Sequence, residues 1–270
     1  MAVEKGGVAI SGENKSKYIP TEAGSYTVTA SATGYNSKTS VAVEVRLPIF
    51  LLEKFQFNNI LQYEYEYDNL NRLTKQTEYN NSGQSISVYT FTYNIVSGDL
   101  EELKWENPKN PASNSKTTFT KNGSIITIVK EGIDEVKETI ELNAQGRAVK
   151  YTQDWKEDSE TSIYTLTFTW LNGNVTKEEW EQVWNNGGEV SSDAGETTYT
   201  YDDYKTPFYH CTTPKWILWK YQRGHNANNI KTQTLDGGST YTHDYTYNYD
   251  GFPSTRTNGG NLETYIYKKK

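Results

Sequence analysis

The feature that most constrains this chain is a strict alternation of aromatic with polar residues, repeated from about residue 60 onward. Tyr63, Tyr65 and Tyr67 alternate with glutamates, and the aromatic and leucine residues of 164–170 alternate with three threonines. Successive side chains of a β-strand point to opposite faces, so each run has one aromatic face and one polar face. No window shows a sustained helical period. The pattern therefore predicts an all-β fold.

Turn residues separate these runs. Examples are Asn122-Gly123, Asn172-Gly173 and Asp250-Gly251, and such pairs tolerate the positive φ that tight hairpins require. The strand ends recur roughly every 26 residues, which corresponds to one two-stranded hairpin per step. We predict a long antiparallel up-and-down meander of about fourteen strands, curled into an open or flattened barrel.

Two segments depart from this series and set the predicted domain organisation. Residues 1–46 form a small N-terminal β segment, and residues 47–270 form the meander. Within the meander, an insert at about 204–229 breaks the alternation and carries Trp216 and Trp219. A barrel of about fourteen strands is too wide for side chains alone to fill, so the insert is expected to plug or cap the concave face. The alternative is a hydrophobic loop packed on one end of the barrel.

Charge and cysteine usage restrict the partners and the compartment. The net charge of -7 disfavours nucleic acid and anionic membranes, because phosphate binding needs a basic face. The single cysteine, Cys211, excludes an internal disulfide framework. No segment reaches the length of about 20 apolar residues of a transmembrane helix. Met1 does not open a signal peptide, so an exported protein would begin here after a removed leader.

The residues that could carry chemistry do not form a recognisable catalytic or metal-binding pattern. His210 is adjacent to Cys211, but neighbours in a strand point to opposite faces. The three histidines and one cysteine lack the spacing of a zinc site. Asp202-Asp203 ends a tyrosine-rich strand, so we interpret this pair as a turn. We predict a protein without enzymatic activity, metal or cofactor.

Tryptophans are the only candidates for recognition. Trp155, Trp180 and Trp184 lie among charged and amide residues, a setting in which flat aromatic platforms stack on sugars. The alternative is that these side chains only cover a barrel interior or a sheet face. Trp216 and Trp219, in the insert, would instead line a site for an apolar ligand.

Two functional classes therefore stay open. One is a monomeric binding or scaffold protein whose partner is a polysaccharide or another protein of the bacterial envelope. The other is a carrier of an apolar or lipid ligand on the concave face beneath the insert. A membrane-spanning barrel is disfavoured, because its strands need an apolar lipid-facing side, and here that side is mostly tyrosine.

Three segments resemble known bacterial families. Residues 65–74 resemble the Y-x-Y-D-x-x-G-R-L-T unit of YD (Rhs-type) repeats, with Asn71 in place of the usual glycine. Residues 245–253 are similar to the Y-x-Y-x-Y-D-x-G-x-P ending of Bacteroidetes surface lipoproteins of unknown function. The spacing of 205–208 and 228–230 is similar to the K-N-P-F and N-N-I elements of the same group.

This resemblance implies a porin-like β-meander, export to the cell surface or periplasm, and no known activity. The membrane would be reached only through a lipid anchor that this chain lacks, since Cys211 lies mid-sequence. The alternation at 24–30 and the turn at 34–36 resemble the last strands of bacterial immunoglobulin-like domains, and residues 1–46 would supply about half of such a domain.

Overall fold

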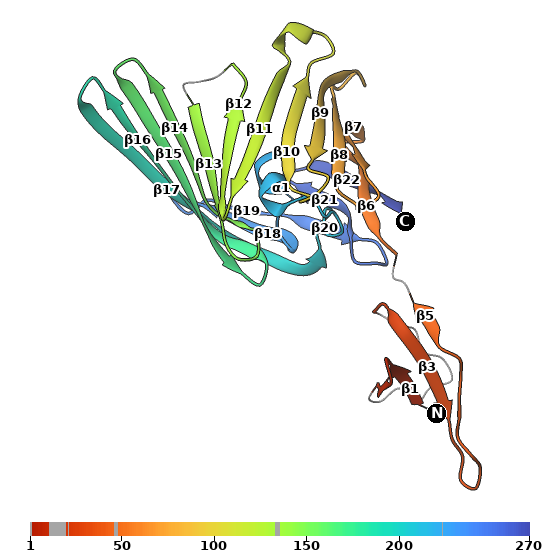
Figure 1. Ribbon diagram of the computed structural model, residues 1–270. Coiled ribbons are helices and arrows are strands. Elements are labelled where there is room, and N and C mark those ends of the chain that lie inside the picture. Colours follow the sequence, from red (N-terminus) through yellow and green to blue (C-terminus); the bar gives the residue numbers. More distant parts are fainter. Residues whose placement is uncertain (1, 11–19, 21, 46–47, 133–135, 223) are drawn as a thin grey trace. The chain divides into compact units, whose positions relative to one another are not determined.

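The computed structural model divides into two compact units (Figure 1). It describes residues 2–10, 20, 22–45, 48–132, 136–222 and 224–270. One unit comprises residues 1–50 with 269–270, and the other comprises 51–268.

The N-terminal unit is a five-stranded antiparallel sheet. Its strands are β1 (Ala2–Lys5), β2 (Val8–Ala9), β3 (Gly24–Ala30), β4 (Lys38–Thr39) and β5 (Val43–Val45). The order is β2-β1-β3-β4, and β5 also pairs with β3. Val3 and Tyr26 are buried between these strands, and the Tyr26 hydroxyl donates to the Glu22 carbonyl at 2.9 Å. The immunoglobulin-like character of this segment stays a prediction.

The larger unit confirms the all-β antiparallel meander curled into a barrel. Its strands are β6 (Phe50–Phe57), β7 (Ile60–Tyr67), β8 (Leu73–Tyr79), β9 (Ser85–Tyr93), β10 (Leu100–Glu106), β11 (Ser115–Asn122), β12 (Ile125–Lys130), β13 (Val136–Leu142), β14 (Ala148–Glu157), β15 (Glu160–Leu171), β16 (Asn174–Asn186), β17 (Glu189–Lys205), β18 (Asn228–Leu235), β19 (Thr240–Thr242), β20 (Asp244–Tyr247), β21 (Pro253–Asn258) and β22 (Asn261–Lys269). Each strand lies beside the next in sequence, and β22 lies beside β6, so the order closes.

The barrel has 17 strands in the described residues, more than the predicted number of about fourteen. One cause is His243, which separates β19 from β20 in a run that reads as one strand. Another is β6, which begins at Phe50, before the alternation that starts at about residue 60. Leu51 and Leu52 in that strand are fully buried.

Four hairpin loops share one geometry, in which an Asp or Asn side chain holds the loop. The Asn143 side chain accepts from the amides of Gln145 and Arg147 at 3.0 and 3.1 Å. The equivalent side chains are Asp68, Asn80 and Asn248. The fourth loop position has positive φ in each case, at Asn71, Gly83, Gly146 and Gly251. Asn tolerates this conformation better than other non-glycine residues, which explains how Asn71 occupies a glycine position.

The inserted segment lies inside the barrel and contains helix α1 (Lys215–Gln222) (Figure 1). Its Trp216, Ile217 and Leu218 are buried in one cluster with inward-facing residues of the strands. Thr213 fixes the segment to the wall, because its hydroxyl accepts from the Leu73 amide at 2.7 Å. The insert therefore plugs the barrel interior, as in the first of the two alternatives, and is not a loop packed on one end of the barrel. No helix among the described residues is long and apolar enough to cross a membrane.

Strands β14 to β17 are longer than their neighbours and project beyond them on one side of the barrel (Figure 1). Two of the predicted recognition residues, Trp155 and Trp184, lie near the C-terminal ends of β14 and β16.

Candidate functional site

Two tryptophans face each other across a small residue on the inner surface of the projecting strands. Trp155 of β14 pairs with Ser162 of β15, and Ser162 pairs in turn with Trp184 of β16. Residues directly opposite in an antiparallel sheet share a face, so the three side chains form one row. The next row is Gln153, Tyr164 and Gln182. We call the hollow formed by these two rows the tryptophan slot.

The strand spacing leaves room for a flat ring between Trp155 and Trp184. Neighbouring strands lie about 4.8 Å apart, so the backbones of Trp155 and Trp184 are about 10 Å apart. A ring packed between two aromatic planes at van der Waals distance needs about 7–8 Å between those planes. The hollow has a volume of about 360 Å³.

Polar groups form the floor and one side of the slot. Ser162 is 9% exposed, and its hydroxyl accepts a hydrogen bond from the Gln182 amide at 3.0 Å. Gln153 lies on the other side of Tyr164 in the same row. The slot therefore combines two apolar walls with hydrogen-bonding groups at its edge.

Trp180 lies on the same strand face but outside the slot. It pairs with Leu166 and with Gly195, and its indole covers Gly195 so closely that a Cβ there would lie 2.8 Å from Nε1. Gly195 thus gives the indole a place to lie flat on the sheet. The register of β16 places Trp180, Gln182 and Trp184 on one face of the sheet.

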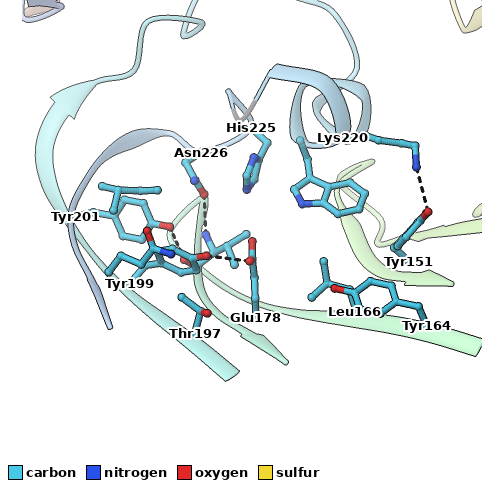
Figure 2. A pocket seen from close by; sticks show the side chains of 14 residues that line it. Tyr151, Tyr164, Leu166, Glu178, Thr197, Tyr199, Tyr201, Lys220, His225 and Asn226 are labelled. Carbon is cyan, nitrogen blue, oxygen red and sulfur yellow. Dashed lines mark hydrogen bonds between the residues drawn. The ribbon is translucent and has the colours of Figure 1, made fainter. Parts of the chain in front are cut away.

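A deeper cavity of about 500 Å³ lies between α1 and strands β14 to β18 (Figure 2). We call it the helix chamber. Trp219 of α1 forms one wall and packs on Phe168 and Tyr151, with ring centroids 4.8 and 5.4 Å away. Tyr164 lines both the helix chamber and the tryptophan slot, so the two adjoin.

The polar groups of the helix chamber come from both of its sides. The Tyr199 hydroxyl donates to the Glu178 carboxylate at 2.8 Å. The Lys220 ammonium donates a hydrogen bond to the Tyr151 hydroxyl at 3.2 Å and forms an ion pair with Glu138. Figure 2 shows the ring of His225 directed into the chamber, opposite Glu178.

A third cavity, of about 610 Å³, adjoins the helix chamber on the side of β20 to β22. Arg256 forms an ion pair with Glu263 here, and the Tyr265 hydroxyl donates to the same carboxylate at 2.6 Å. Burial and the charge of Arg256 lower the pKa of His243. Charged and amide groups therefore line much of the barrel interior.

Of the residues that could carry chemistry, His225 lines the helix chamber and His243 the third cavity, whereas His210 and Cys211 line none of these cavities. Burial raises the pKa of the Cys211 thiol, so this side chain stays a thiol at neutral pH. His210 packs on Phe252, with ring centroids 5.2 Å apart. Within the described ranges, no three His, Cys, Asp or Glu side chains gather in a group that could hold a metal ion.

The five tryptophans predicted as ligand contacts are thus divided among different places. Trp155 and Trp184 form the slot, and Trp219 lines the helix chamber. Trp216 is buried against Phe119, with ring centroids 5.3 Å apart, and lines neither. Sequence reasoning missed Tyr164, which joins the two cavities, although its strand was predicted with the correct face.

Comparisons with known proteins give distant likenesses only. No protein-family model matches the chain, and no curated protein matches it. Among solved structures, a porin-like protein from Bacteroides uniformis ATCC 8492 is 13% identical, with 80% of this chain and 96% of that chain covered and a TM-score of 0.37. A porin-like protein from Bacteroides vulgatus ATCC 8482 is 14% identical, with 82% and 99% covered and a TM-score of 0.36.

A third solved structure is a TcdB2-TccC3-Cdc42 assembly. The similarity there is 12% identity over 91% of this chain but only 15% of that chain, with a TM-score of 0.30. All three likenesses are too distant to support a function for this protein.

Proposed function

We propose that this chain is a non-enzymatic carbohydrate-binding protein of a bacterial envelope, and that it holds a sugar ring between Trp155 and Trp184. The observation that carries the proposal is the cross-strand row of two tryptophans separated by Ser162. A pyranose ring has two faces of C–H groups and a rim of hydroxyls. Its faces match the indole walls, and its rim matches the amides of Gln153 and Gln182.

The chemistry of the interior favours this ligand class over an apolar one. A carrier of lipid would have to place hydrocarbon against Glu178, Arg256 and Glu263, which line the deeper cavities. Removing water from such groups without new hydrogen bonds costs free energy. A hydroxylated ligand replaces the lost hydrogen bonds, so its binding avoids this cost.

The envelope location rests on sequence. The motif at 245–253 and the spacing of 205–208 and 228–230 resemble those of Bacteroidetes surface lipoproteins, and 65–74 resembles a bacterial YD repeat. Protease accessibility on intact cells that express the whole gene tests the location. Protection of the protein both in intact cells and in cells with a permeabilised outer membrane would contradict it.

Isothermal titration calorimetry with hexasaccharides tests the binding site. Suitable probes are cello-, malto-, xylo-, laminari- and chito-hexaose, with a long-chain fatty acid as the apolar comparison. We expect saturable binding of at least one hexasaccharide. Trp155→Ala and Trp184→Ala should each weaken it by about 30-fold or more, because truncation of a central tryptophan typically costs about 2 kcal/mol or more.

Two pairs of variants separate the slot from general effects. Ser162→Leu fills the space between the indoles and should abolish binding, whereas Ser162→Ala removes only the hydroxyl and leaves the slot open. Trp105→Ala is the matched control, because Trp105 is half-buried on β10, away from the slot. Binding of fatty acid alone, or equal effects of Trp105→Ala and Trp155→Ala, would overturn the proposal.

A further inference from the structure

The helix chamber contains a buried side chain whose hydrogen-bonding groups have no partner. His225 is 7% exposed, and both its ring nitrogens are buried without a hydrogen bond to any described residue. Leaving one buried polar group unpaired costs about 1–3 kcal/mol. A folded protein keeps such a group where a ligand completes its hydrogen bonds or where the group has another role.

Contacts with Trp170 and the hydrogen bonds of the next residue fix the orientation of His225. Its ring and that of Trp170 pack in a T-shaped arrangement, with centroids 5.7 Å apart and an interplanar angle of 78°. The next residue, Asn226, accepts from the Val175 amide at 2.9 Å, and its own carbonyl accepts from Thr206 at 3.1 Å. Anchored in this way, the imidazole is directed into the chamber (Figure 2).

The charge of His225 defines what it can bind. Burial and the nearby charge of Lys215 lower its pKa to about 3, so the ring is neutral at physiological pH. A neutral imidazole has one N–H donor and one nitrogen acceptor. A carboxylate can only accept and an ammonium can only donate, whereas a hydroxyl group does both.

The other residues that line the chamber also favour a hydroxylated ligand. Glu178 adds a carboxylate that takes hydrogen bonds from donors. Trp219 and Tyr164 offer aromatic surface on which the C–H face of a ring can pack. The positive charge of Lys220 is taken up by Glu138, which makes the chamber a poor site for an anion.

We propose that the helix chamber binds one small neutral polyhydroxylated molecule, such as a free monosaccharide or a cyclic polyol, with hydroxyls paired to His225 and Glu178. The chamber volume of about 500 Å³ lies within the range of about 300–1,000 Å³ typical of small-ligand sites. This site is distinct from the tryptophan slot and does not depend on it.

Imidazole nitrogen resonances test the proposal directly, because the chain has only three histidines. The ¹⁵N-labelled protein is titrated with myo-inositol, D-glucose, D-galactose and N-acetyl-D-glucosamine, each up to 50 mM, in long-range ¹H–¹⁵N correlation spectra. We expect at least one probe to shift both His225 nitrogens saturably while the His210 signals stay in place.

Variants then assign the binding to the chamber. His225→Phe keeps a ring against Trp170 and should weaken binding of the probe by at least tenfold. Glu178→Gln keeps the shape of the side chain and should weaken binding of the probe about tenfold, since hydrogen bonds to a charged acceptor are roughly twice as strong as neutral ones. This variant provides the test if His225→Phe does not fold. Ser162→Leu blocks only the slot and should leave this binding intact.

The outcomes separate the two sites. Hexasaccharide binding lost in Ser162→Leu, with monosaccharide binding retained, supports two independent sites. The chamber proposal would be overturned if no probe shifted the His225 signals, or if wild type and folded His225→Phe bound the probe with equal affinity. Either result would leave the proposal for the tryptophan slot unaffected. A probe that binds His225→Phe normally but not Ser162→Leu belongs to the slot and would also overturn it.

Discussion

Acid should destabilise this protein through His225, and the size of the effect follows from its burial. The pKa of His225 is lowered to about 3, first by burial and then by the charge of Lys215, whereas an exposed histidine titrates near 6.5. Between these values the unfolded chain binds a proton that the folded chain excludes. Stability therefore falls as pH drops below about 6.5, with the full loss reached near the folded pKa.

The magnitude is about 1.4 kcal/mol per pH unit within this window. At pH 4.5, two units below the unfolded pKa, His225 alone should cost about 2.7 kcal/mol of the free energy of unfolding relative to neutral pH. That is a large part of the stability of an ordinary domain. His225→Phe keeps the ring packing on Trp170 but has no proton to bind, so this contribution should vanish.

Urea unfolding, followed by tryptophan fluorescence at pH 7.0, 6.0, 5.0 and 4.5, measures the effect in both proteins. Other groups titrate too. His243 has a pKa lowered by burial and Arg256, and Asp99 has one lowered by a hydrogen bond from Lys121. Both contributions weaken the fold as pH falls, and both are the same in wild type and variant. The difference between the two proteins thus isolates His225, and a difference that stays constant across pH would refute the reasoning.

Three further substitutions test local packing and loop geometry, each read by urea unfolding at pH 7. Gly224→Ala should destabilise by about 1–3 kcal/mol, because a Cβ there would lie 2.4 Å from Cδ2 of the buried Phe208; a loss below about 0.5 kcal/mol would mean that the phenyl ring moves freely. In the loop after β13, Asn143→Ala should cost about 1–2 kcal/mol through two lost hydrogen bonds to backbone amides. Gly146→Ala should cost about 1 kcal/mol through backbone strain alone, since φ is +71° and no atom lies within 4 Å of the new Cβ; an unchanged midpoint would contradict the assignment of strain to this position.

The strands and their faces could be predicted because the signals are local. The alternation at 63–67 and at 164–170 gives the inward side chains directly, and the Asn and Gly positions give the turns. The strand number was underestimated because β6 starts in an apolar run without alternation, and because the run at 240–247 breaks at His243. Neither feature has a period that a sequence window can detect.

Only part of the tryptophan slot could be predicted from the sequence. Trp155 and Trp184 were identified one at a time, but their pairing depends on two hairpin registers that place Ser162 opposite both. The turn at Asp158 gives the first register, but the second shifts by one residue at a β-bulge between Thr169 and Trp170, so the turn at Gly173 does not reveal that Ser162 lies opposite Trp184. The role of His225 could not be predicted either, because it depends on Asn226 meeting Val175, a contact 51 residues apart in sequence.

Closure of the barrel has a consequence for how the protein is made. The Asn58 amide donates to the Leu262 carbonyl at 2.7 Å, and the Leu262 amide donates to the Asn58 side chain at 2.8 Å, across 204 positions. A chain that emerges from the ribosome N-terminus first must therefore hold an unfinished sheet, with β6 exposed at one edge, until β22 arrives. Free edges invite pairing with other chains, and such distant contacts form slowly. The final strand ends this vulnerable period by pairing with both edges in one step, so protection by chaperones matters most before β22 has been synthesised.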